Sequence, residues 1–324
     1  ASFLSKPAAS PAIAHSWMIR DHTSPLISRS YSFIGAGIEQ LTGYSSREIN
    51  GEVWSRIIQE CAMAGEAAGL DKKEAVRRAT RGELRHWRCD MRILTREGKS
   101  RWLSDASVQN LDEAGRVIGS MGILEDITER KQAELSALAL SKLGQSLISA
   151  TTPADAALAL FEAANELFKW DACDFHLYSP EQDAVLPVLF MDTVDGRQVE
   201  ATPPNRDGKP SLLDRQIIEQ GAQLTLKGAS SPASDPKPAL SDDSSRPSAC
   251  VMRVPVRLRT NKVTGILTVH SNRPKAYREK DLNTLQMLAD CCGVALERIW
   301  ADEALRKSES QFRLVWESSG DGMR

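Results

Sequence analysis

The sequence predicts an α+β protein with two antiparallel-sheet domains, joined and flanked by long helices that are expected to dimerise. Two observations lead to this prediction. Three strand-like runs follow one another over residues 87–125, and short connections containing glycine separate them. Two further stretches, near residues 133–147 and 285–299, repeat apolar residues at alternating steps of four and three, which is typical of helices that pack along one face.

Length and composition limit the classes of protein that this chain can belong to. Its 324 residues suggest two domains, and a content of 41% hydrophobic and 26% charged residues suits ordinary folded cores. The 41 basic and 43 acidic residues give a formal net charge of -2, so no basic patch of the kind that binds nucleic acid is expected.

Cysteine spacing and hydropathy indicate a cytoplasmic chain. The six cysteines show no CxxC or CxH spacing, so we expect reduced thiols and no metal site. Without a run of 18 apolar residues, no membrane span is predicted. The chain lacks an initial Met and ends within a pattern, which is typical of a piece of a longer protein.

The first domain is expected after a loose tail at residues 1–14. A helical stretch around Gly37–Leu41 and a charged helix at Asp71–Arg81 come before the strands. The strands are Trp87–Leu94, Ser100–Gln109 and Val117–Glu125. Because both connections place a glycine where a hairpin loop needs positive φ, these strands are predicted to form a three-stranded antiparallel meander.

A long polar helix is predicted to follow the meander from Glu129, as a linker over residues 131–150. Its spaced small and apolar residues are Ala133, Ala137, Leu140, Gly144 and Leu147. This pattern fits the seam of a coiled coil, and it fits equally a helix that packs on its own domain.

The second domain is predicted to begin with a capped helix. Thr152 is a suitable cap, with Pro153 at the first helical position and Asp155 three residues after the cap. The apolar face of this helix consists of Ala157, Leu160, Phe161, Ala164, Leu167 and Phe168.

Four strands are expected in the second domain. They are Cys173–Tyr178, Val185–Met191, Met252–Leu258 and Val263–His270. In the third strand, apolar residues alternate with Arg253 and Arg257, which predicts that this strand is half-buried. The Ser- and Pro-rich stretch Lys227–Ser248 is expected to be a loop, either a lid over a ligand or an inert insertion.

A second long helix is predicted from Asp281, with at least 25 residues. Its apolar residues keep the same spacing: Leu285, Ala289, Cys292, Leu296 and Ile299. Charged residues dominate after residue 301, so the helix outruns its domain and is expected to be a connector over residues 299–312.

The first domain resembles a PAS domain with its PAC motif, over residues 15–130. The most specific string is Gly122-Ile123-Leu124-Glu125-Asp126-Ile127-Thr128-Glu129-Arg130-Lys131. Tyr31–Ile34, Ile38–Ser45 and Arg101–Leu103 support it. One departure is that Ile57–Cys61 stands where many such domains carry His-Pro-Asp-Asp.

Residues 151–298 resemble a GAF domain, through Val254–Val256, Gly265–Val269, Tyr277 and Asp281. Residues 313–324 resemble the start of a second PAS domain. This order resembles the input region of bacterial sensor histidine kinases. The resemblance implies a region that senses a small ligand or cellular state and relays it through helices to an output domain outside the chain.

No catalytic machinery is predicted within the chain. Phosphate-binding glycine loops, GGDEF and EAL strings are absent, and none of the five histidines resembles a phospho-accepting one. His15 is expected in the tail. No flavin-adduct, bilin or haem signature is present, so no cofactor is predicted, although an unidentified small ligand is allowed. The parent protein is expected to be a histidine kinase.

The predicted functional residues are a relay hinge, Asp126, Ile127 and Thr128, as the PAS resemblance implies. Asp126 is expected to pair with a cation or a backbone N–H, and Thr128 to cap the outgoing helix. Ligand-binding residues are not predicted.

The expected partners are a second copy in a parallel homodimer, a C-terminal output domain and, indirectly, a response regulator. Three other functions remain open: the input region of a diguanylate cyclase or phosphodiesterase, that of a transcription regulator, and a scaffold that only mediates dimerisation.

Overall fold

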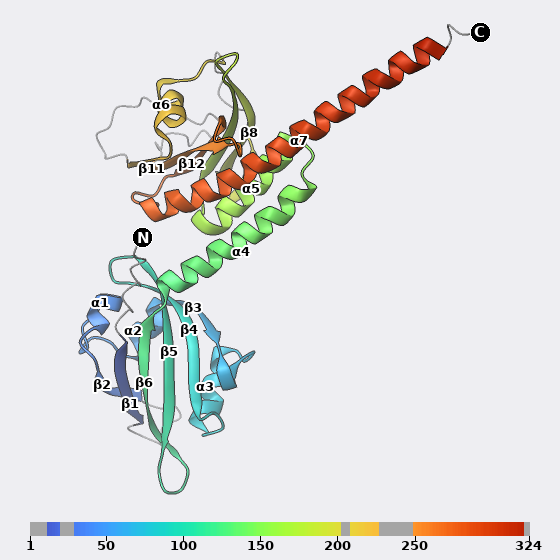
Figure 1. Ribbon diagram of the computed structural model, residues 1–324. Coiled ribbons are helices and arrows are strands. Elements are labelled where there is room, and N and C mark those ends of the chain that lie inside the picture. The colour runs from blue at the N-terminus through green and yellow to red at the C-terminus, as the bar shows by residue number, and fades with distance from the viewer. Residues whose placement is uncertain (1–11, 20–28, 202–207, 227–248, 321–324) are drawn as a thin grey trace, which may run out of the picture. The chain divides into compact units, whose positions relative to one another are not determined.

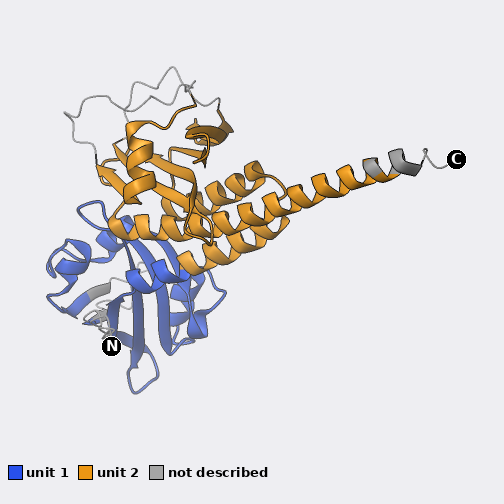
Figure 2. Cartoon of the chain, turned by 45° about the horizontal axis from the view of Figure 1, so that its top comes forward, with its two compact units in different colours: residues 1–134 blue, residues 135–324 orange. Residues whose placement is uncertain are grey.

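The computed structural model describes residues 12–19, 29–201, 208–226 and 249–320, so the predicted loop at 227–248 lies outside the described residues. The chain divides into two compact units, residues 1–134 and 135–324 (Figure 2). Each unit contains one antiparallel sheet with helices against it (Figure 1). The predicted α+β class with two antiparallel sheets is therefore confirmed.

The described strands of the first unit form a six-stranded sheet in the order β2-β1-β6-β5-β4-β3. These strands are β1 (Ile13–Ile19), β2 (Arg29–Ile34), β3 (Ile58–Met63), β4 (His86–Leu94), β5 (Ser100–Leu111) and β6 (Val117–Asp126). Strands β4, β5 and β6 are the predicted meander. Gly98 and Gly115 in its turns have φ of 76° and 77°, which glycine adopts without steric cost.

Short helices pack against one face of this sheet. They are α1 (Ile38–Thr42), α2 (Gly51–Ile57), the 3₁₀ turn η1 (Gly65–Ala67) and α3 (Lys72–Thr80). Helix α3 is the predicted charged helix, and the carboxylate of Asp71 caps it by accepting the N–H groups of Lys73 and Glu74. Helix α2 and strand β3 were not predicted from the sequence.

The predicted tail is too long by two described residues. Strand β1 begins at Ile13, so residues 13 and 14 belong to the sheet. His15 is a strand residue rather than a tail residue, and it is only 3% exposed. Pairing of β1 with both β2 and β6 explains the difference, because these long-range contacts leave no local signal in the sequence.

The described strands of the second unit form a six-stranded sheet in the order β10-β11-β12-β7-β8-β9. They are β7 (Ala172–Ser179), β8 (Ala184–Val194), β9 (Arg197–Glu200), β10 (Gln223–Leu226), β11 (Cys250–Arg257) and β12 (Val263–Ser271). The prediction of a half-buried β11 is wrong at Arg253, which is 9% exposed. A second helix packs on the opposite face of the sheet, and the alternation of residues along the strand does not show this.

Helices α5 (Pro153–Phe168) and α7 (Glu279–Gly320) cover one face of the second sheet, and the short helix α6 (Leu212–Gln220) lies on the other face (Figure 1). The C-terminal part of α4 (Thr128–Ser149) contacts α5 and α7. The predicted cap of α5 is confirmed as a capping box between Thr152 and Asp155. Helix α7 approaches β11 closely, since a Cβ on Gly293 would lie 1.8 Å from the carbonyl oxygen of Arg257. No helix in the described part of the chain is long and apolar enough to cross a membrane.

The predicted seam of α7 belongs to the core of the second unit, whereas that of α4 does so only at Leu147. On α7 all five seam residues are buried: Leu285, Ala289, Cys292, Leu296 and Ile299. On α4 the buried stripe is Ala139, Leu143 and Leu147, whereas Ala133 and Ala137 are exposed. The packing of these helices on their own domain therefore accounts for most of the apolar periodicity.

Candidate functional site

Strand β5 places polar side chains toward the core and an apolar side chain toward solvent. Ser107 and Gln109 are 7% and 5% exposed, whereas Val108 between them is 44% exposed. Met121, opposite Val108 on β6, is 62% exposed. Because a buried polar group without a partner costs about 1–3 kcal/mol, this reversed polarity indicates that the inside of the sheet is not a plain core.

A cavity of about 260 Å³ lies on the inner side of the sheet, between it and helices α2 and α3. We call it the β5 cavity, because Asp105, Ser107 and Gln109 of that strand line it. Aromatic residues form much of the remaining wall: Tyr31, Trp54 and Trp87.

The polar residues of the β5 cavity are incompletely bonded. His15 Nε2 lies 3.0 Å from Asp105 Oδ1. A carboxylate only accepts hydrogen bonds, so Nε2 of His15 is the donor of this bond, and in the neutral ring Nδ1 is then an acceptor. Nδ1 of His15, Oε1 of Gln109 and Nε1 of Trp54 are buried and have no hydrogen-bond partner within the structure. Such groups are usually bonded to protein or water, so these atoms mark positions where water or a polar ligand can bind.

Two cysteines on neighbouring strands also line the β5 cavity. The half-buried Cys61 lies on β3, and Cys89, which is 2% exposed, lies on β4. The neighbouring thiol of Cys89 lowers the pKa of Cys61 to about 7. The proximity of Cys61, together with burial, raises the pKa of Cys89. Cys61 is therefore the more reactive thiol of the pair near neutral pH.

The predicted hinge residues lie where β6 ends and α4 begins. Arg101 Nη1 donates to Asp126 Oδ2 at 2.8 Å, and the N–H of Thr128 donates to Asp126 Oδ1 at 2.9 Å. Asp126 thus meets both expected partners, a cation and a backbone N–H. The prediction that Thr128 caps the helix is wrong, because its hydroxyl oxygen instead accepts the N–H of Trp102 on β5 at 2.9 Å.

The first turn of α4 is tied to the sheet by a second contact. Lys131 Nζ lies 3.2 Å from Asp90 Oδ2 on β4, and this hydrogen bond raises the pKa of Lys131. The ammonium also lies 5.8 Å from the ring centroid of Trp102. Ile127, between the two polar hinge residues, is 3% exposed. These contacts attach the start of α4 to strands β4 and β5.

In the second unit, a buried carboxylate lies between two histidines on the sheet face opposite α5. Asp174 Oδ2 lies 3.0 Å from His176 Nδ1, and Asp174 Oδ1 lies 3.2 Å from His270 Nε2. Burial by itself raises the pKa of Asp174, but the hydrogen bonds from both histidines more than offset this and hold the pKa below its usual value. His176 Nε2 is buried without a partner in the structure. Among the described residues, no three His, Cys, Asp or Glu side chains are arranged so that they could hold a metal ion.

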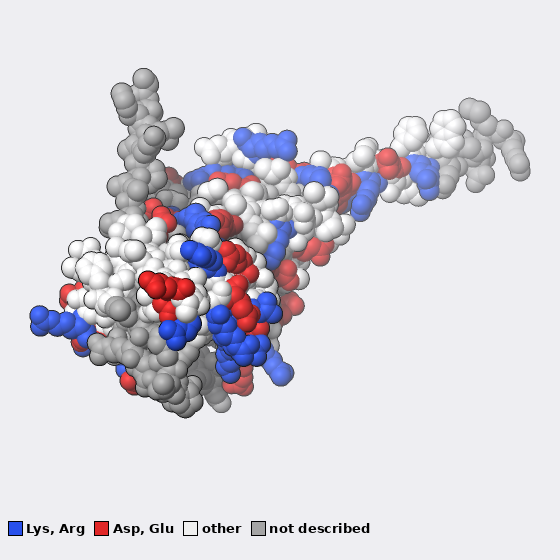
Figure 3. All heavy atoms as spheres, turned by 90° about the horizontal axis from the view of Figure 1, so that it is seen from below, with Lys and Arg blue, Asp and Glu red and all other residues white. Residues whose placement is uncertain are grey.

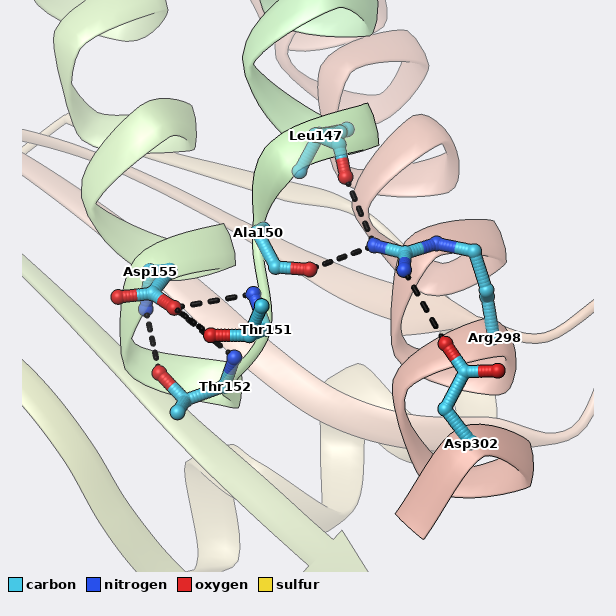
Figure 4. A network of polar contacts seen from close by, with 7 residues as sticks. All are labelled: Leu147, Ala150, Thr151, Thr152, Asp155, Arg298 and Asp302. Carbon is cyan, nitrogen blue, oxygen red and sulfur yellow. Dashed lines mark hydrogen bonds and ion pairs between the residues drawn. The ribbon is translucent and has the colours of Figure 1, made fainter. Parts of the chain in front are cut away.

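A guanidinium joins the end of α4 to α7 (Figure 4). Arg298 Nη2 donates to the carbonyl oxygens of Leu147 and Ala150 at 3.0 and 2.6 Å, and its Nη1 lies 3.3 Å from Asp302 Oδ2. The last carbonyl groups of a helix have no partner within the helix, so Arg298 completes the C-terminus of α4. The incoming and outgoing helices of the second unit are thus directly bonded.

On the face shown in Figure 3, Lys and Arg side chains lie interspersed with Asp and Glu side chains. This mixture agrees with the nearly balanced composition and shows no single-sign patch on that face.

Several of these residues were missed from the sequence. They are His15, Asp105, Gln109, Asp174 and Arg298. The detectable signal was on β5, where Leu103, Asp105, Ser107 and Gln109 form one face and Ala106 and Val108 belong to the other. Such an alternation predicts that the apolar face is buried, and the structure shows the opposite.

Two family profiles match the chain. The PAS fold profile matches residues 30–132, and the GAF domain profile matches residues 150–297. A curated relative, the methyl sulfide methyltransferase-associated sensor of Methanosarcina acetivorans, is 24% identical over 248 residues. That alignment covers 72% of this chain and 23% of the relative, so the chain spans about a quarter of that protein.

Solved structures show weaker likenesses. The GAF domain of a putative sensor histidine kinase from Pseudomonas syringae pv. tomato is 16% identical, with a TM-score of 0.40, covering 56% of this chain and 97% of that one. The N-terminal domain of a diguanylate cyclase with PAS/PAC sensor from Marinobacter aquaeolei is 21% identical, with a TM-score of 0.29, covering 37% and 99%. With TM-scores this low, neither likeness supports an argument about function.

The profile matches agree with the two sheets and with the motifs read from the sequence. Residues 30–132 form a PAS domain and residues 150–297 a GAF domain, and the chain has the domain order of a sensory input region.

Proposed function

We propose that this chain is the sensory input and signal-relay region of a two-component sensor histidine kinase. In this proposal the β5 cavity binds a small ligand, and the helices α4 and α7 carry the resulting change to an output domain outside the chain. The observation that carries the proposal is that β5 lines the cavity through Asp105 and holds the hinge through Arg101 and Trp102.

The proposed relay begins at β5. A ligand that displaces Asp105 shifts a strand whose neighbouring residues bond to Asp126 and Thr128. Packed elements have discrete arrangements, so a small shift favours one of two packings of the hinge. Helix α4 then transmits the difference to its C-terminus, where Arg298 passes it to α7. Such a signal requires only that α4 has two positions and that the ligand changes their relative populations.

The proposed partner of α7 is a second copy of the chain in a parallel homodimer. The predicted seam is occupied by the GAF core, but other apolar residues of α7 are free of it. Met287 and Val294, seven residues apart, are 52% and 37% exposed, and Leu305 and Phe312, also seven apart, are 59% and 70% exposed. A spacing of seven residues is that of a coiled-coil seam. The proposed location is the cytoplasm, where a response regulator would receive the phosphoryl group from the output domain.

The relative from Methanosarcina acetivorans supports a sensory role, because its name describes a sensor.

Ligand sensing is tested on the whole chain with a library of small amines, alcohols and carboxylates. Compounds that raise the melting temperature are then examined by hydrogen exchange over residues 125–135. We expect at least one library member to bind and to change exchange at the hinge. A library without any binder, or binders that leave the hinge unchanged, would contradict the sensory proposal.

The kinase assignment is tested separately, on the complete reading frame that contains this chain. Incubation with radiolabelled ATP should give a phosphoprotein that is stable to base and labile to acid, as phosphohistidine is. Formation of cyclic di-GMP from GTP, or specific DNA binding without phosphorylation, would instead assign the chain to a cyclase or to a transcription regulator.

A further inference from the structure

Among the buried side-chain groups at the β5 cavity with unused hydrogen-bonding capacity, acceptors outnumber donors. Asp105 contributes a carboxylate with about four lone-pair sites, of which the bond from His15 takes one. Gln109 Oε1 is a further acceptor without a partner, as is Nδ1 of His15 in the neutral ring, and Trp54 Nε1 is the corresponding donor. A ligand that donates hydrogen bonds and carries positive charge complements this set better than one that accepts them.

The walls of the β5 cavity favour the same kind of ligand. Tyr31, Trp54 and Trp87 are aromatic, and the face of an aromatic ring attracts a cation. Lys72 also lines the cavity, but its side chain is exposed, so its flexible stem can keep the ammonium in water. Asp105 is more enclosed, with 20% of its side chain exposed. Asp105 is therefore the carboxylate that a ligand in the cavity meets.

We propose that the β5 cavity binds a small organic cation, such as a protonated amine or an amidinium. Its N–H groups donate to Asp105, and its carbon skeleton packs against the aromatic walls. The 260 Å³ cavity has room for a ligand of roughly nine non-hydrogen atoms, since a water molecule takes about 30 Å³ of liquid volume. This inference rests on the proposed ligand-sensing function and names the chemical class of its ligand.

Neutral and anionic ligands fit the β5 cavity less well. An anion of the same shape would lose its hydration and meet the carboxylate of Asp105, so its transfer into the cavity is unfavourable. A neutral alcohol can donate one hydrogen bond, but it gains no attraction to the carboxylate beyond that bond. The expected order of affinity is therefore cation, then alcohol, then anion.

The test uses the whole chain and matched sets of probes. Each set has one carbon skeleton (phenethyl, isopentyl or cyclohexylmethyl) bearing an ammonium, a hydroxyl or a carboxylate group. Binding is measured by calorimetry to the wild type, to Asp105→Asn and to Glu97→Gln. The last variant is the matched control, because Glu97 is an exposed carboxylate in a turn of the same domain and does not line the cavity.

We expect at least one ammonium probe to bind at least about tenfold more tightly than its alcohol, since charge-assisted hydrogen bonds are roughly twice as strong as neutral ones. Asp105→Asn should remove this preference and leave alcohol binding within about twofold, while Glu97→Gln should retain it. Equal or tighter binding of an alcohol or a carboxylate, an unchanged preference in Asp105→Asn, or no binding by any ammonium probe would overturn the inference. The library experiment would still decide the sensory function, because a binder of another class keeps that function and removes only the cationic ligand.

Discussion

Arg101 and Asp105 lie four residues apart on strand β5 and bond to different partners. Asp105 pairs with His15 at the β5 cavity, and Arg101 pairs with Asp126 at the start of the linker helix. Successive side chains of a strand point to opposite faces, so residues four apart share a face. Strand β5 therefore connects a group at the cavity, Asp105, with a group at the predicted hinge, Arg101, over a short distance along one strand.

Asp126→Ala should loosen the hinge and leave the PAS fold intact. The variant loses the bonds to Arg101 and to the N–H of Thr128, and hydrogen bonds to charged groups are worth about 1.5–3 kcal/mol each. Amides at residues 127–131 should therefore exchange faster, while those of β4 and β5 keep their protection. Glu125→Ala is the matched control, because Glu125 is exposed on the same strand. Equal exchange in both variants would refute a hinge role for Asp126.

Arg298→Ala should release the end of α4 from α7. Two carbonyl groups lose their donor, so the amides of residues 147–152 should exchange at least about tenfold faster, as expected for a loss above 1.4 kcal/mol. Arg298→Lys should restore little, because an ammonium lacks the planar fork that serves two acceptors together. The control is Arg306→Ala, an exposed arginine farther along α7. If Arg306→Ala speeds exchange at residues 147–152 as much, then the bonds from Arg298 do not hold the end of α4 on α7.

Asp174→Asn should destabilise the GAF domain by about 3 kcal/mol at pH 7, because it removes one member of a buried ionic group. The pKa of Asp174 is depressed in the folded state, so its contribution is present above the unfolded value of about 3.9 and is lost as the pH falls through the folded value. The variant should therefore lose less stability than the wild type on acidification below about pH 4. Urea unfolding between pH 3 and 7 measures both effects.

The matched control for that experiment is Asp183→Asn. Asp183 forms an exposed ion pair with Arg215, and such surface pairs contribute little. Its unfolding curve should match that of the wild type. A destabilisation of Asp174→Asn no larger than this control would contradict the importance of the buried carboxylate.

Alkylation of Cys61 should follow a pH midpoint near 7. The thiolate is the reactive form, so the rate of reaction with iodoacetamide rises as the pH rises through the lowered pKa of Cys61, which is about 7. Cys89→Ala removes the neighbouring thiol and should move the midpoint toward the ordinary thiol value of about 8.5. Mass spectrometry of the peptide containing Cys61 measures the rate. An unchanged midpoint in Cys89→Ala would show that the thiol pair does not set the reactivity.

Gly293→Ala should prevent normal packing of α7 on β11. The added Cβ would lie 1.8 Å from the carbonyl oxygen of Arg257, so the helix or the strand must move. Gly144→Ala on α4 is the control, because no atom lies within 4 Å of its added Cβ and alanine favours a helix by about 1 kcal/mol. Thermal unfolding should show a large decrease in melting temperature for the first variant and a small increase for the second.

Sequence patterns predicted the elements that local signals determine. The meander from β4 to β6 was found because Gly98 and Gly115 mark its turns, and α5 was found because Thr152, Pro153 and Asp155 mark its start. The short strands β9 and β10, with four residues each, gave too little pattern to detect.

Functional contacts were harder to predict because they join distant parts of the chain. His15 and Asp105 are 90 residues apart, and Arg298 is 148 residues from Ala150. The apolar spacing on α7 was read correctly as a packed face, but periodicity does not tell whether the partner is another chain or the same domain. The predicted hinge residues were chosen from a motif, and their contacts with strand β5 became evident only from the structure.

The most direct test of the relay is the affinity of the β5 cavity in the hinge variant. Coupling between two sites is reciprocal, so a hinge that responds to the ligand must also change how tightly the ligand binds. The dissociation constant of the tightest library compound is measured by calorimetry for the wild type, Asp126→Ala and Glu125→Ala. We predict a change of about fivefold or more in Asp126→Ala and none in Glu125→Ala. Identical dissociation constants in all three proteins, with exchange showing a loosened hinge in Asp126→Ala, would contradict coupling between the cavity and the hinge.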